Sequence, residues 1–125
     1  MTALTPFTVL VVEDEALIRL DLASDLMQRG FRVLEAGSAS EAIEILDRDR
    51  SIYVVFTDVR MPGNMDGIAL AKCVRERWPP TIIVVCSGNC EEAGDVADIH
   101  IIEKPYMTDQ MVMVLDAVEQ QLQMA

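Results

Sequence analysis

Five polar side chains follow short apolar segments of this sequence, and their chemical types could act together. They are, in chain order, Glu13 and Asp14, Asp58, Ser87 and Lys104. If the apolar segments are parallel strands, their carboxyl ends share one edge of a sheet, which is where open α/β folds bind ligands. Three carboxylates, a hydroxyl and an ammonium group would then converge on one place.

Clustered carboxylates repel one another and raise each other's pKa unless a cation neutralises them. Mg²⁺ suits such a cluster, because it binds a few carboxylates and keeps positions for water or phosphate oxygens. Lys104 would add a mobile positive charge, and Ser87 a hydrogen-bond donor. An aspartate can itself accept a phosphoryl group, in a reaction that depends mainly on positioning and charge neutralisation. Each residue alone is better explained as a helix start or a surface charge, but the five together predict Mg²⁺-dependent phosphoryl transfer.

The segments that must position these residues alternate between strand-like and helix-like patterns. We expect strands over residues 8–12, 31–36, 52–57, 81–86 and 99–102. We expect helices over residues 16–29, 39–48, 66–77 and 91–97, and a last one from residue 108 or 109. Five successive β-α units predict an α/β fold, in which a parallel sheet is covered by helices on both faces. We expect one domain over 1–125, with residues 1–7 as a flexible tail.

Local signals place several of these boundaries. In the first helix the apolar positions 17, 20, 23/24 and 27, flanked by 16, 18, 22 and 26, form a broad helical stripe. Gly30 supplies a left-handed stop for that helix, and Phe31 the apolar contact beyond it. A capping box at residues 38–41 opens the second helix. Trp78 ends the third helix and should lie at the opposite edge of the sheet from the polar cluster.

Composition excludes several classes of function. The net charge of −11 opposes binding to nucleic acid or anionic membranes and suits a cation ligand or a basic partner. Three cysteines at irregular spacing argue against a disulfide framework and favour a reducing cytoplasm. No apolar run approaches the ~20 residues of a membrane helix, and no signal peptide is recognisable.

The motifs at the four strand ends resemble those of receiver domains from bacterial two-component response regulators, single-domain members in particular. They are Glu13-Asp14, Asp58-x-x-Met61-Pro62, Ser87-Gly88 and Lys104-Pro105, spread over nearly the whole chain. The resemblance implies a flavodoxin-like (βα)5 three-layer sandwich with strand order 2-1-3-4-5. It also implies a sensor histidine kinase or a histidine phosphotransfer protein as partner.

The resemblance assigns a role to each residue of the site. Asp58 would take the phosphoryl group from a phosphohistidine. Mg²⁺ would be bound directly by Asp14 and Asp58, through water by Glu13, and by the main-chain carbonyl of Arg60. Lys104 would bridge to the phosphoryl oxygens, and Ser87 would bind one of them after phosphorylation. The protein would thus catalyse its own phosphorylation and dephosphorylation.

Two departures from the family pattern concern the loop after the acceptor and the switch. The loop over residues 61–67 is one residue longer than the commonest spacing, and Ile101 replaces the usual aromatic residue. We therefore expect ordering of the helix at 91–97, rather than rotation of a ring, to carry the signal. A downstream protein would bind the region 91–122 of a monomer or weak dimer.

Four other functions would use the same fold or part of the same residues. A phosphate sink or relay without its own output uses the same residues. An unphosphorylated docking module leaves the acid, serine and lysine set unexplained. A flavin-binding protein would need a hydroxyl-rich loop where Glu13-Asp14-Glu15 stand, and those acids would repel a phosphate. A hydrolytic enzyme would need a pocket-forming insertion, which the sequence lacks.

Overall fold

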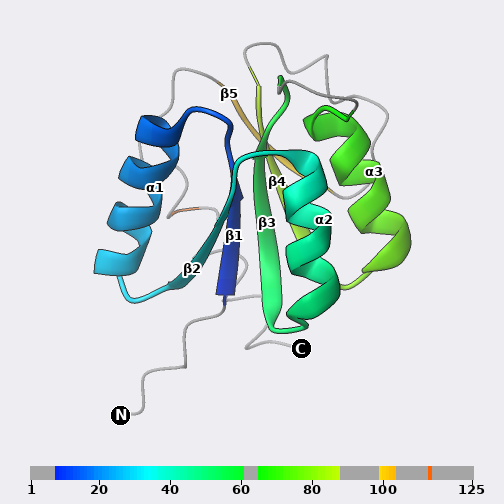
Figure 1. Cartoon of the computed structure of the whole chain (residues 1–125), viewed down its shortest axis with the longest axis horizontal. Coiled ribbons are helices and arrows are strands. Elements are labelled where there is room, and N and C mark those ends of the chain that lie inside the picture. The colour runs from blue at the N-terminus through cyan, green and yellow to red at the C-terminus, as the bar shows by residue number, and fades with distance from the viewer. Residues whose placement is uncertain (1–7, 61–64, 88–98, 104–112, 114–125) are drawn as a thin grey trace.

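Five parallel strands form the centre of the protein in a computed structural model that describes residues 8–60, 65–87, 99–103 and 113. The strands are β1 (Thr8–Val12), β2 (Arg32–Ala36), β3 (Ile52–Asp58), β4 (Ile82–Ser87) and β5 (Ile99–Glu103). They lie in the order β2-β1-β3-β4-β5 (Figure 1), which confirms the flavodoxin-like order that the resemblance implied. The expected helices at 91–97 and from 108 lie outside the described residues, apart from residue 113.

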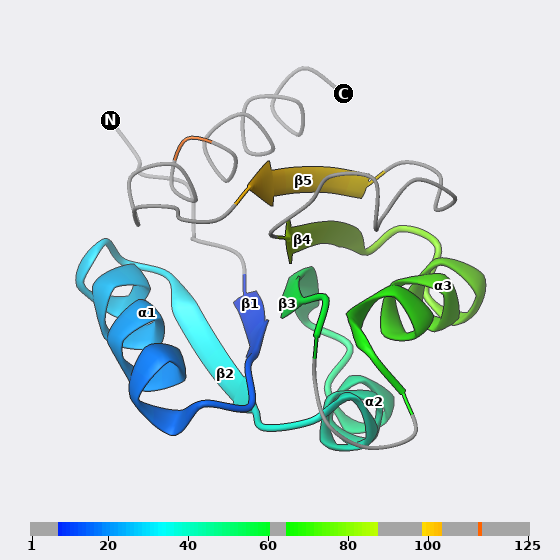
Figure 2. The same ribbon diagram turned by 90° about the horizontal axis from the view of Figure 1, so that it is seen from above.

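Helices cover both faces of the sheet, as Figure 2 shows: α1 (Ala16–Gln28) lies on one face, and α2 (Ala39–Arg48) and α3 (Gly67–Arg77) lie on the other. Side chains along β1 alternate between the two faces, so Leu10 and Val12 join the apolar cluster under α2 and α3. Val9 and Val11 join the cluster under α1. The sheet is therefore buried on both sides, which explains the continuous apolar runs of its central strands.

Hydrogen bonds at the end of α1 and at the start of α2 confirm the helix stop and the helix cap that the sequence predicts. Gly30 has a φ of 98°, and the backbone N–H of Phe31 donates to the carbonyl of Leu26 at 3.1 Å, as in a Schellman motif. The Ser38 side chain accepts from the N–H of Glu41 at 3.2 Å. The Glu41 carboxylate accepts from the N–H of Gly37 at 2.9 Å, so the capping box closes one residue earlier than the standard form.

The broad apolar stripe predicted for α1 is buried only in part. Leu17, Leu20 and Met27 are 83%, 53% and 51% exposed, and the buried residues of α1 are Leu22, Ala23 and Leu26. The helix is apolar around most of its circumference, so its pattern does not select one face. Packing against the sheet selects the narrower stripe, and a row of large apolar side chains is left facing outward.

The edge of the sheet where β3 begins carries Trp78 and no part of the acidic cluster. Trp78 follows α3, and the guanidinium of Arg77 lies 4.4 Å from the centre of its ring. The prediction that Trp78 lies far from the polar cluster is confirmed, because it lines a hollow with Ile52 and Thr81 at the strand starts. None of the helices in the described part of the chain has the length and apolar composition to cross a membrane.

Candidate functional site

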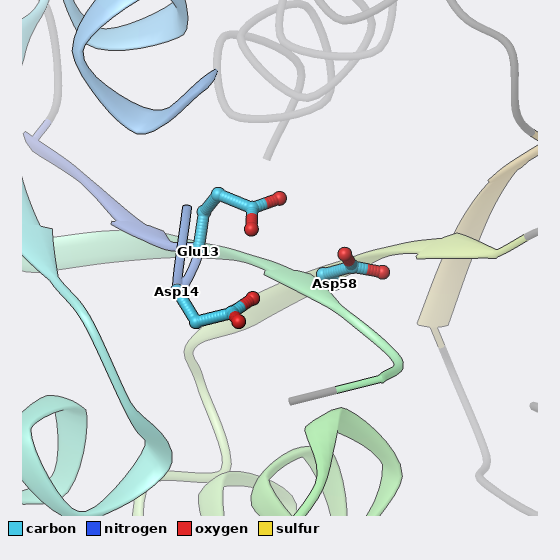
Figure 3. A group of neighbouring side chains, drawn as sticks. All are labelled: Glu13, Asp14 and Asp58. Carbon is cyan, nitrogen blue, oxygen red and sulfur yellow. The ribbon is translucent and has the colours of Figure 1, made fainter. Parts of the chain in front are cut away.

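The carboxylates of Glu13, Asp14 and Asp58 meet at the carboxyl edge of the sheet (Figure 3). Glu13 and Asp14 follow β1, and Asp58 ends the neighbouring strand β3. Their ligand oxygens all lie within 4.8 Å of one another. The pairing of Val12 with Thr57 places the next residues of both strands side by side. The predicted convergence of these three acids is confirmed.

The three acids differ in how far they are exposed to solvent. Glu13 and Asp58 are each only 7% exposed, whereas Asp14 is exposed at the mouth of the cluster. Burial, reinforced by a hydrogen bond with Asp14 and by the charges of Asp58 and Asp14, raises the pKa of Glu13 to about 7. The N–H of Glu15, which donates to the Glu13 carboxylate at 3.0 Å, opposes that shift.

The donor set fits a hard divalent cation. All three side chains offer carboxylate oxygens, which Mg²⁺ prefers, and they come from two adjacent strand ends with one side open to solvent. A cation would relieve the repulsion among the carboxylates, which adds to the effect of burial on the pKa of Glu13, and would leave room for phosphate oxygens on the exposed side. The residues present therefore fit Mg²⁺.

The backbone at Asp58 is held from the neighbouring strand and from α3. The N–H of Val59 donates to the carbonyl of Cys86 at 3.2 Å, and the N–H of Gly67 donates to the carbonyl of Val59 at 2.8 Å. The Thr57 hydroxyl donates to the carbonyl of Asp58 at 2.9 Å. Gly67 approaches so closely that a Cβ there would lie 1.9 Å from the carbonyl oxygen of Asp58. Sequence reasoning missed this contact, although a glycine at a helix start signals a close approach.

Residues 9–116 match the family described as the response regulator receiver domain. The chain belongs to this family. The hydrogenase transcriptional regulatory protein HoxA of Cupriavidus necator is 37% identical over 91% of this chain, and the transcriptional regulatory protein PdtaR of Mycobacterium tuberculosis is 32% identical over 91%. The chain spans 24% of HoxA and 57% of PdtaR.

The crystal structure of a response regulator receiver protein from Sinorhizobium medicae has the same fold. It is 36% identical to this chain and superposes with a TM-score of 0.81. The match covers 92% of this chain and 95% of that protein, so it extends over a whole receiver. The receiver fold predicted from the motifs is therefore confirmed both by sequence and by structure.

The other three predicted site residues are Ser87, Lys104 and Arg60, and the structure describes two of them. Ser87 ends β4, is 1% exposed and comes directly after Cys86, the partner of Asp58 in the adjacent strand. Lys104 lies outside the described residues, directly after Glu103, which pairs with Ser87. Arg60 is exposed two residues beyond Asp58, and the use of its carbonyl as a ligand stays a prediction.

Two residues of β5, Ile101 and His100, lie outside the acidic cluster. Ile101, at the usual aromatic position of a receiver, is 39% exposed. His100 is half-buried in the middle of the strand, where it pairs with Val84 rather than with a residue of the acidic cluster.

Proposed function

We propose that the protein is the phosphoacceptor of a two-component phosphorelay and that Asp58 is the residue phosphorylated. The donor would be the phosphohistidine of a sensor histidine kinase or of a histidine phosphotransfer protein. The observation that carries the proposal is the meeting of three carboxylates within 4.8 Å at the strand ends of a receiver fold. Asp58 is the acceptor in this proposal because it ends the central strand and begins the motif that continues to Met61-Pro62.

In the transfer, a carboxylate oxygen of Asp58 forms a bond to phosphorus while the bond from phosphorus to the donor's imidazole nitrogen breaks. The nitrogen keeps the electron pair of the broken bond. Mg²⁺, when bound, would neutralise the carboxylates and the phosphoryl oxygens. Asp14 and Asp58 would hold the ion directly, Glu13 through water, and the carbonyl of Arg60 would be a further ligand.

Ser87 and Lys104 would complete the site on the side of β4 and β5. The Ser87 hydroxyl would donate to a phosphoryl oxygen, which is supported by the position of Ser87 directly after Cys86, the partner of Asp58 in the next strand. Lys104 would pair its ammonium group with another phosphoryl oxygen. The support for Lys104 is its sequence position, because its neighbour Glu103 pairs with Ser87.

The output of the phosphorylated protein is proposed to be regulatory. HoxA and PdtaR are named transcriptional regulatory proteins, which favours a signal passed to an output partner over simple storage of phosphate. The region 91–122 is proposed as the surface for that partner. Three cysteines at irregular spacing, which do not suggest a disulfide framework, support a cytoplasmic location.

Phosphorylation by a small donor tests the acceptor. Acetyl phosphate with Mg²⁺ should add one phosphoryl group that hydroxylamine removes, as detected by intact-protein mass spectrometry. Asp58→Asn should abolish the adduct, because the amide keeps the shape but loses the nucleophilic charge. Asp47→Asn is the matched control, since it changes an exposed aspartate whose ion pair with Arg77 lies away from the acidic cluster. A stable adduct on Asp58→Asn would contradict the proposal.

Capture of a partner separates a signalling receiver from a phosphate relay. Beryllofluoride with Mg²⁺ mimics the acyl phosphate without being transferable, so a signalling receiver should retain its output partner more strongly in that state. A relay or sink should show no such gain, and its phosphoryl group should instead move to a histidine phosphotransfer protein.

A further inference from the structure

Arg19 of α1 joins the acid-bearing turn after β1 to the end of β2. Its Nη1 donates to the main-chain carbonyl of Glu13 at 2.8 Å, and its Nε donates to Oε1 of Glu35 at 3.2 Å. The Arg19 side chain is 21% exposed, so both interactions are largely shielded from solvent. We propose that Arg19 is a positioning residue that orients the Glu13 and Asp14 carboxylates for the cation, an inference that rests on the proposed function.

The carbonyl that Arg19 binds belongs to the peptide plane between Glu13 and Asp14. The N–H of Glu13 donates to the carbonyl of Ala36 at 3.0 Å, so the main chain of Glu13 is held on its donor and acceptor sides. Because the peptide group is planar, fixing the direction of the Glu13 carbonyl also restricts the direction in which the Asp14 side chain leaves the backbone. Arg19 thus acts on the metal site through the backbone, by its hydrogen bond to the Glu13 carbonyl.

The guanidinium group of Arg19 has a geometry that allows both hydrogen bonds, and the turn after β2 leaves space for it. Two different nitrogens of Arg19 reach two acceptors in different elements, which a single lysine nitrogen does not do in the same rigid way. Gly37, in the turn after β2, leaves room for the group, because a Cβ there would lie 3.2 Å from Nη1 of Arg19. The end of β2 therefore contributes both an acceptor and an open space.

The charge of Arg19 and its positioning role act on Mg²⁺ affinity in opposite directions. A guanidinium near a cation site repels the cation, so loss of the charge alone would strengthen Mg²⁺ binding. Loss of the hydrogen bond to Glu13 would weaken binding, because the carboxylates would no longer be held in the required geometry. The sign of the change in affinity therefore distinguishes the two effects.

Mg²⁺ titration of three variants tests the inference. Arg19→Met keeps the apolar stem and removes the fork, and Arg19→Lys keeps the charge with one nitrogen. Arg32→Met is the matched control, because Arg32 bonds Asp49 at 3.2 Å and Ser51 at 2.8 Å at the opposite edge of the sheet. The dissociation constant for Mg²⁺ should rise ~10-fold in Arg19→Met, the size of effect seen when a group that orients metal ligands is lost. It should rise several-fold in Arg19→Lys and stay unchanged in Arg32→Met.

A purely structural role would lower the stability of Arg19→Met and Arg32→Met alike and leave both Mg²⁺ constants at the wild-type value. That result, or tighter Mg²⁺ binding by Arg19→Met, would overturn the inference. Wild-type affinity in Arg19→Lys would overturn the role of the fork, and this variant also decides the matter if Arg19→Met does not fold. Absence of Mg²⁺ binding by the wild-type protein would instead refute the proposed function on which the inference rests.

Discussion

Substitution of Gly67 by alanine should damage both the fold and the metal site, because this glycine touches the backbone that carries Asp58. A Cβ at position 67 would lie 1.9 Å from the carbonyl oxygen of Asp58, 2.7 Å from its carbonyl carbon and 2.9 Å from the Cα of Val59. To reach the 3.4 Å of an ordinary contact from 1.9 Å, the end of β3 and the start of α3 must separate by about 1.5 Å.

The loss of unfolding free energy depends on which atoms must move to make room for the Cβ. Inserting a methyl group into a packed core typically costs ~1–3 kcal/mol when side chains can adjust. Here the obstacle is backbone, and the separation also disrupts the 2.8 Å hydrogen bond from Gly67 to Val59. Loss of such a bond adds ~1 kcal/mol, so we expect Gly67→Ala to lose about 3 kcal/mol of unfolding free energy. A shift of this size would also spoil the geometry of a Mg²⁺ site, because that ion demands a near-ideal octahedron.

Urea unfolding in EDTA and in excess Mg²⁺ measures both effects. Gly30→Ala is the control, because its φ of 98° predicts a loss of ~1–2 kcal/mol far from the acids, with a full Mg²⁺ response. Gly67→Ala should lose more stability in EDTA and gain little from Mg²⁺. A variant less than about 1 kcal/mol below wild type, with an undiminished Mg²⁺ response, would refute the close-approach argument.

Three further predictions concern the acids and the outward face of α1. Because the pKa of Glu13 is raised from 4.5 to about 7, its protonated form stabilises the metal-free protein at low pH, and that contribution should be lost as pH rises through 7. Urea midpoints in EDTA from pH 4.5 to 8 should therefore fall less in Glu13→Gln; equal slopes would contradict the shift. Asp14→Ala should stabilise the protein in EDTA and abolish the Mg²⁺-induced rise in thermal midpoint, and a retained rise would exclude Asp14 as a ligand. Leu17→Gln should change the unfolding free energy by less than ~0.5 kcal/mol, whereas Leu26→Ala should cost ~2–5 kcal/mol; similar losses in the two variants would contradict the exposed position of Leu17.

The sequence was sufficient for the five strands and three helices of the described residues and for the gathering of the acids, because parallel strands end at one edge whatever their exact register. It was not sufficient for the register itself. The ladder between β1 and β3 shifts by one residue after Thr8, so that Val9 pairs with Val54 and Val12 with Thr57. That irregularity determines which residue of β3 lies next to Glu13. No local sequence pattern in either strand predicts the irregularity.

Contacts between segments distant in the chain were also missed, because no local sequence pattern predicts them. The approach of Gly67 to Asp58 and the bond from Arg19 to Glu13 depend on how the helices are placed on the sheet. The outward row of α1 shows the limit of periodicity when a helix is apolar on several sides. The prediction that the helix at 91–97 carries the switch concerns residues outside the described ranges and stays a prediction.

Peptide mapping identifies the phosphorylated residue. Wild-type protein phosphorylated with acetyl phosphate and Mg²⁺ would be treated with borohydride, which reduces an aspartyl phosphate to homoserine. Digestion and tandem mass spectrometry then locate the homoserine. We expect homoserine at position 58, and only in protein that received both the donor and Mg²⁺. Homoserine at position 14 or at another aspartate, with Asp58 intact, would contradict it.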